Sequence, residues 1–225
     1  MVKLLPQNFP PQTPSAIASY SFTDIASGTG VVNFLGAVTQ NDTTKDYILN
    51  TTELASNDIF VSGGATFAGN TAWTEVINKD FDVVFNLPQT IKGTAYLSVG
   101  IGLEGGGGGG GLANLKVSGA QIIHYDGTTE TVVGTGSSET FIPLINSSKE
   151  GKNMLIPFTL TEKFFRAGDI LRLSMIVFIR TTGSAGVVSY GFGADPTDRD
   201  FDTTLPADVS TKMTLAMPFR VDIGQ

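Results

Sequence analysis

Hydrophobic and polar residues alternate along much of the chain, which is the pattern of β-strands with one buried face. The clearest case lies near the C-terminus, where one face of segment 212–223 carries Met213, Leu215, Met217, Phe219, Val221 and Ile223. The other face includes Pro218, which cannot donate to a strand ladder and therefore predicts an edge or a bulge. We predict a half-buried strand that places Met213, Leu215, Phe219 and Val221 in the core.

Other segments repeat this alternation. Residues 90–101 and 152–160 each place apolar side chains on one face, whereas 170–180 becomes apolar on both faces at IVFI. A strand that is apolar on both faces is expected at the centre of a sheet or at a subunit contact. Weaker strand patterns occur at 17–22, 31–38, 47–49, 59–62, 73–77, 82–87, 115–125, 130–133 and 187–192.

Turn and helix signals between these segments are few. Asp126-Gly127 is typical of the turn of a β-hairpin. A single helical turn is predicted over 161–166, closed by Ala167-Gly168-Asp169. Helix should therefore make up less than about a tenth of the chain, against the usual third.

The N-terminal segment differs from the rest. Residues 1–15 contain Pro6, Pro10, Pro11 and Pro14, and proline fixes φ and lacks an amide donor. We predict an extended arm at 1–15, which is either a loose tail or a segment that reaches a neighbouring subunit. No linker divides residues 16–225, so we predict one all-β domain there, an antiparallel β-sandwich of jelly-roll-like type.

Composition and charge narrow the possible partners. The net charge is −7 and the chain has no cysteine, which excludes disulfides, thiolate metal sites and cysteine nucleophiles. An acidic surface repels phosphate, so we expect no direct nucleic-acid partner. We recognise no signal peptide and no membrane span, and we expect synthesis in a host cytoplasm.

Seven consecutive glycines, Gly105–Gly111, separate two predicted strands. A phosphate-binding loop would be followed by a helix and would usually contain a lysine, and neither is expected here. The run is either a loop tip or a segment that lets backbones meet closely at a symmetry axis or a ligand.

Catalytic signatures are scarce. His124 is the only histidine, and no G-x-S-x-G motif accompanies it. Trp73 is the only tryptophan, which is little for a sugar cleft with aromatic platforms. We therefore expect a structural or surface histidine, no catalytic residue, no cofactor and no enzyme activity.

The densest acidic segment, 195–202, offers a weak calcium candidate. Asp198, Asp200 and Asp202 share one side of an extended segment, a spacing that can bind Ca²⁺. The calcium-loop signature fails, because no glycine follows Asp202 and position twelve from Asp198 is Val209. A solvated acidic loop neutralised by Arg199 is the alternative.

Two segments carry a family resemblance. SYSFTDIASGTGVVNF at 19–34 and FFRAGDILRL at 164–173 resemble segments of structural proteins of bacterial and archaeal viruses. The resemblance implies jelly-roll-like domains that decorate, brace or project from capsids.

The function expected from this resemblance is that of a virion structural protein, a capsid, decoration, vertex or spike subunit that acts through self-assembly. Its partners would be other virion proteins and copies of itself, in a trimer or a larger homo-oligomer. The alternative is a carbohydrate-binding module or adhesin that uses Trp73, nearby tyrosines and the glycine run.

Overall fold

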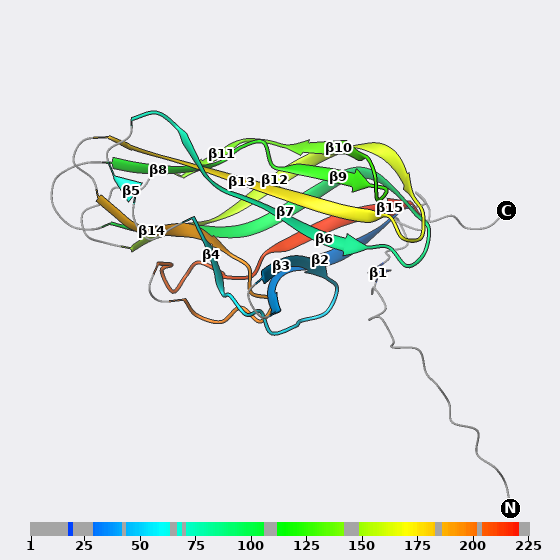
Figure 1. Cartoon of the computed structure of the whole chain (residues 1–225), viewed down its shortest axis with the longest axis horizontal. Helices are drawn as coiled ribbons and strands as arrows, with labels where there is room; N and C mark the ends of the chain where they lie inside the picture. Colours follow the sequence, from blue (N-terminus) through cyan, green and yellow to red (C-terminus); the bar gives the residue numbers. More distant parts are fainter. Residues whose placement is uncertain are drawn as a thin grey trace, which may run out of the picture.

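The computed structural model (Figure 1) describes residues 18–19, 29–41, 44–63, 67–68, 71–105, 112–141, 149–182, 186–201 and 204–220. These residues form strands, turns and loops, and no helix occurs among them, which confirms the all-β prediction. The predicted arm at 1–15 lies outside the described residues. The strands are β1 (Ala18–Ser19), β2 (Thr29–Asn41), β3 (Thr44–Asn50), β4 (Phe60–Ser62), β5 (Phe67–Ala68), β6 (Thr74–Val84), β7 (Gln89–Gly105), β8 (Leu112–Val117), β9 (Gln121–Tyr125), β10 (Glu130–Gly136), β11 (Glu139–Phe141), β12 (Lys149–Phe165), β13 (Ile170–Thr182), β14 (Gly186–Gly193) and β15 (Thr214–Arg220).

Nine of the strands close into a barrel, in the order β2-β3-β6-β13-β9-β10-β12-β7-β15. The ring closes because β15 pairs with β2 along one edge and with β7 along the other. One link is parallel, between Ile48 of β3 and Asp82 of β6. A sandwich of two separate sheets, as the sequence suggested, is not shown, since the strand pairing is continuous around the ring.

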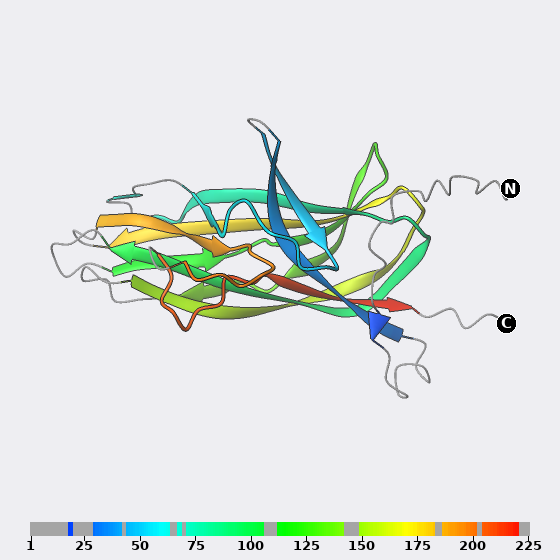
Figure 2. The same cartoon turned by 90° about the horizontal axis from the view of Figure 1, so that it is seen from below.

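Two long strands organise the barrel. One edge of β7 pairs with β12 over nearly its whole length, and the other edge is shared by β15 and β14. In the same way, β13 pairs with β6 on one edge and with β9 and then β8 on the other. The strands outside the ring pair with strands already described: β4 and β5 pair with β14, β11 pairs with β8, and β1 pairs with β2. Figure 2 shows the β2–β3 hairpin crossing the long strands obliquely.

The core lies inside the barrel, and alternation decides which side chains reach it. Met213 and Leu215 are fully buried and Phe219 is nearly so, as predicted, while Val221 lies outside the described residues. The inner face of β13 is entirely buried, whereas Ile176 and Phe178 on its outer face are half-buried. β13 is paired on both edges, as a central strand would be, but so are the other strands of the closed ring. The alternative that this strand lies at a subunit contact stays a prediction.

Three local predictions can be compared with the structure. Asp126-Gly127 forms the predicted hairpin turn between β9 and β10, where Gly127 has a φ of 91°. The pairing of β15 with β7 shifts register between Ala216 and Phe219, an irregularity at the place where Pro218 predicted an edge or a bulge. The predicted helical turn at 161–166 is wrong, because β12 continues to Phe165 through a register shift that keeps it paired with β7.

Within the described part of the chain, we find no helix with the length and apolar character needed to cross a bilayer.

Candidate functional sites

The single histidine is part of a buried pair. Nε2 of His124 lies 2.7 Å from Oδ2 of Asp169, and the imidazole packs edge-on against the ring of Phe165. The same carboxylate oxygen accepts the backbone N–H of Arg166 at 2.8 Å. Hydrogen bonding to His124, and then to Arg166, lowers the pKa of Asp169. The pair therefore joins β9 to the turn between β12 and β13.

A second buried carboxylate holds the loop between β14 and β15. Asp195 is fully buried, and its carboxylate accepts bonds from Nε and a terminal nitrogen of Arg199 and from the hydroxyl of Thr197. Burial alone would raise the pKa of Asp195, but the bonds from Arg199 and Thr197 outweigh it and lower that pKa. Arg199 also donates to the backbone oxygen of Ser56 at 2.6 Å, which ties the loop to the segment that follows β3.

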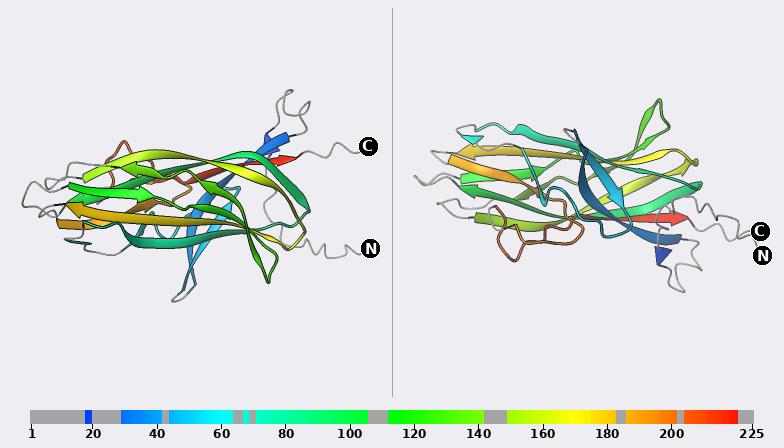
Figure 3. Two further views of the ribbon diagram at one scale, coloured as in Figure 1. Left: turned by 90° about the horizontal axis from the view of Figure 1, so that it is seen from above. Right: turned by 60° about the horizontal axis from the view of Figure 1, so that its bottom comes forward.

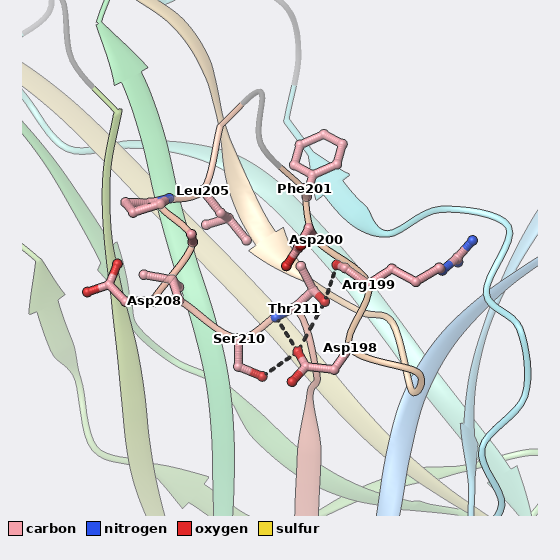
Figure 4. Close-up of a pocket in the computed structure, with 11 residues that line it drawn as sticks. Asp198, Arg199, Asp200, Phe201, Leu205, Asp208, Ser210 and Thr211 are labelled. Atoms are coloured by element: carbon pink, nitrogen blue, oxygen red, sulfur yellow. Dashed lines mark hydrogen bonds between the residues drawn. The ribbon is translucent and has the colours of Figure 1, made fainter.

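Asp198 closes the same loop (Figure 4). Its Oδ1 accepts the hydroxyl of Ser210 at 2.7 Å and the backbone N–H groups of Thr211 and Lys212 at 2.8 and 3.1 Å. Burial would raise the pKa of Asp198, and these bonds lower it. The carboxylate therefore fixes the return of the chain toward β15.

The calcium candidate is only partly visible in this arrangement. Asp198 is engaged by donors of its own loop, Asp200 is exposed, and Asp202 lies outside the described residues. In the described part of the chain, no three His, Asp or Glu side chains are grouped so that they could hold a metal ion. The structure therefore adds no support to the calcium prediction.

Segment 204–211 packs against three glycines on the outer surface of the barrel, Gly100, Gly102 and Gly151. A Cβ at Gly100 would stand 2.0 Å from the backbone oxygen of Ser210, and one at Gly102 would stand 2.3 Å from Leu205. Gly151 on β12 faces Val209 in the same way. A pocket of about 270 Å³ lies between residues 198–201 and residues 205–211 and is lined by both apolar and acidic side chains (Figure 4).

Next to this loop, an outer face of the barrel carries no charged side chain. The register aligns outward residues across β12, β7, β15 and β2, which are paired in that order. We call this surface the uncharged face. Its rows are Thr159–Thr94, Pro157–Tyr96–Ala216–Asn33 and Leu155–Ser98–Thr214.

The uncharged face exposes its largest apolar groups to solvent. Leu155 is 60% exposed and Tyr96 is 45% exposed, although their neighbours along each strand are buried. Charged side chains flank the rows: Glu162 pairs with Lys92 at 3.0 Å and with Arg220 at 3.3 Å, and Lys212 pairs with Glu53 at 2.6 Å. Alternation alone indicates that Tyr96 and Leu155 point outward. Their clustering could not be found from the sequence, because it depends on the pairing of distant strands.

Comparisons with known proteins assign no family. No protein-family model matches the chain, and no curated protein sequence is similar to it. Among solved structures, two of a CocE/NonD family hydrolase from Staphylococcus aureus match 83% of this chain, with TM-scores of 0.41 and 0.39 at 12% and 9% identity. The chain spans 36% of the length of that hydrolase. A structure of infectious bursal disease virus, Gx strain, matches 84% of this chain and 50% of its own, with a TM-score of 0.18 at 10% identity.

The prediction that the chain is not an enzyme is contradicted by these comparisons, since two of the matching structures are of a hydrolase. That prediction rested on the absence of recognised catalytic motifs. Catalytic groups can be brought together from residues that are distant in sequence, so the absence of a motif does not exclude activity. TM-scores of 0.41 and 0.39 are nevertheless too low to carry an activity, a substrate or a catalytic residue to this chain.

Proposed function

We propose that this chain is a self-assembling structural subunit that associates with copies of itself through the uncharged face. The observation that carries the proposal is the cluster of exposed Leu155, Pro157 and Tyr96 on a surface whose rows hold no charge. The centres of protein interfaces are depleted in charged residues and often contain tyrosine. The rows of the uncharged face hold no charged residue, and Tyr96 lies among them.

The net charge of the chain favours a second copy as the occupant of this face. Two molecules that each carry a charge of −7 repel one another wherever acidic surfaces meet. Contact through the uncharged face brings no like charges together and desolvates none. The barrel favours contact between faces rather than strand addition, because β7 and β15 are already paired on both edges.

We further propose that the assembly is a virus particle, in which the chain serves as a capsid, decoration, vertex or spike subunit beside other virion proteins. This part rests on the resemblance of segments 19–34 and 164–173 to viral structural proteins. A jelly-roll-like fold, an arm at 1–15 that reaches a neighbouring subunit, and a trimeric or larger state belong to the same proposal.

The mass of the protein in solution tests the interface. Leu155→Glu with Tyr96→Glu places two charges in the centre of the uncharged face. Leu87→Glu is the matched control, because Leu87 is 70% exposed in the turn between β6 and β7, away from this face. We expect the wild type and the control to form oligomers of equal mass and the double variant to be monomeric by analytical ultracentrifugation. A monomeric wild type at high concentration, or a double variant of unchanged mass, contradicts the proposal.

A further inference from the structure

Trp73, the only tryptophan of the chain, forms cation–π contacts with two cationic side chains. Nζ of Lys116 lies 4.7 Å from the centroid of the Trp73 ring, and Cζ of Arg180 lies 4.6 Å from it. Lys116 also lies 5.2 Å from the ring centroid of Phe178. All four residues are half-buried. Their charges are therefore partly desolvated and are held in place by aromatic contacts.

Strand register brings these residues together. Trp73 immediately precedes β6, Lys116 lies opposite Phe178 across β8 and β13, and Arg180 lies opposite Asn114. Strands β6, β13 and β8 lie side by side (Figure 3). The cluster therefore occupies the outer surface of β13, on strands other than those of the uncharged face.

A buried amide fixes the arginine. Asn114 is only 4% exposed, and its side-chain oxygen accepts from Nε and a terminal nitrogen of Arg180 at 2.9 and 3.3 Å in the amide orientation that satisfies both residues. The amide nitrogen donates to the backbone oxygen of Ala113 at 3.2 Å in that orientation. A guanidinium has five N–H donors, so several remain for a ligand after these bonds.

Neither cation is neutralised within the described part of the chain. Lys116 and Arg180 form no ion pair there, although Arg172 on the same strand contacts Asp82 at 2.8 Å and also pairs with Glu130. Glu75 lies opposite Phe178, but it accepts from Asn78 at 3.2 Å and pairs with neither cation.

We propose that Trp73, Lys116 and Arg180 form a binding site for an oxyanion, such as a carboxylate, sulfate or phosphate group of a ligand. Hydrogen bonds between cations and oxyanions are about twice as strong as neutral ones, and a guanidinium matches the geometry of a planar or tetrahedral oxyanion. Trp73 orients the cations, and Asn114 holds Arg180 in place without neutralising it. A neutral sugar stacked on this ring would have to compete with two cations, so the site favours an acidic ligand over a neutral one.

The fluorescence of Trp73 reports directly on this site, because the chain has one tryptophan. The protein is titrated separately with sodium sulfate, sodium phosphate, sodium glucuronate and sodium acetate, each against sodium chloride at matched ionic strength. We expect a saturable change with at least one oxyanion and none with chloride. Saturation by sulfate and phosphate assigns a tetrahedral group, and saturation by glucuronate and acetate assigns a carboxylate.

Lys116→Gln and Arg180→Gln remove one cation each and should each weaken binding about tenfold or more. Lys79→Gln is the matched control, since Lys79 lies 5.1 Å from the Tyr47 ring, outside the site, and should bind as the wild type does. Calorimetric titration of the wild type provides a readout that does not depend on the variants folding. The proposal is overturned if no oxyanion gives saturation by either method, if chloride gives the same change, or if both folded variants keep wild-type affinity.

Discussion

His124 on β9 and Asp169 in the turn after β12 form a buried hydrogen bond of 2.7 Å between Nε2 and Oδ2. The other ring nitrogen, Nδ1, is buried and has no hydrogen-bond partner among the described residues. The carboxylate of Asp169 ties His124 to the turn between β12 and β13. The backbone of Phe85 holds the same turn, since its N–H donates to the carbonyl of Asp169 and its C=O accepts the N–H of Gly168.

Replacing His124 should therefore cost stability. His124→Ala removes the partner of a mostly buried carboxylate, and an unsatisfied buried polar group costs about 1–3 kcal/mol. We expect the free energy of unfolding in urea to fall by about that amount. Thr131→Ala is the control, because Thr131 lies opposite His124 across β9 and β10 but is exposed. A variant as stable as the wild type would show that the pair contributes nothing.

Asp169 should make stability depend on acidity. Its pKa is lowered in the folded state by the bond to His124, so the folded protein favours the charged form. The resulting stabilisation is fully present above the ordinary carboxyl pKa of about 4 and is lost as pH falls through the folded-state value. We expect Asp169→Asn to be less stable at neutral pH and to lose less stability on acidification. Urea unfolding across this pH range measures both, and parallel curves for the variant and the wild type would count against the role.

The Asp195–Arg199 pair should contribute more to the free energy of unfolding than a surface ion pair does. Arg199→Met leaves the fully buried Asp195 without its cation, and we expect a loss of about 1–3 kcal/mol in unfolding free energy. Lys92→Met breaks an exposed pair with Glu162 and should reduce the unfolding free energy much less than Arg199→Met does, because solvent screens the pair. Equal losses of unfolding free energy in the two variants would show that the pair with Asp195 stabilises the fold no more than an exposed ion pair does.

Gly100 should be intolerant of any side chain. Gly100→Ala places a methyl group where the backbone oxygen of Ser210 stands, so segment 204–211 must move outward. Overpacking of this kind typically costs about 1–3 kcal/mol, and the displaced loop should be cleaved faster by proteases. Ser98→Ala is the control on the same strand and face, with no expected effect. A loop equally protected in Gly100→Ala would refute the tight contact.

The arm remains a prediction from sequence alone, and deletion of residues 2–14 tests it. A proline-rich segment has φ angles that are already restricted, so it loses less entropy on docking than a flexible one. We expect the truncated protein to form smaller oligomers than the intact chain by analytical ultracentrifugation. Retention of the full oligomeric mass and of incorporation into particles would show that the arm is not an assembly device.

The sequence predicted best those features that depend on neighbouring residues. The burial of Met213, Leu215 and Phe219 follows from alternation, and the turn at Asp126-Gly127 follows from local backbone preferences. The helical turn at 161–166 was wrong because pairing with β7 decides the conformation there, and that partner is more than 60 residues away in sequence. No local pattern could reveal the contact of Arg180 with Trp73 or of Arg199 with Ser56.

The position of β15 has a consequence for the order of events during synthesis. Its partners β2 and β7 emerge from the ribosome well before it, and each leaves an edge open until residues 214–220 appear. Open edges are sites of misassociation, and pairings between residues so distant in sequence form slowly. The ring of paired strands therefore cannot close during synthesis until this last described strand has been made.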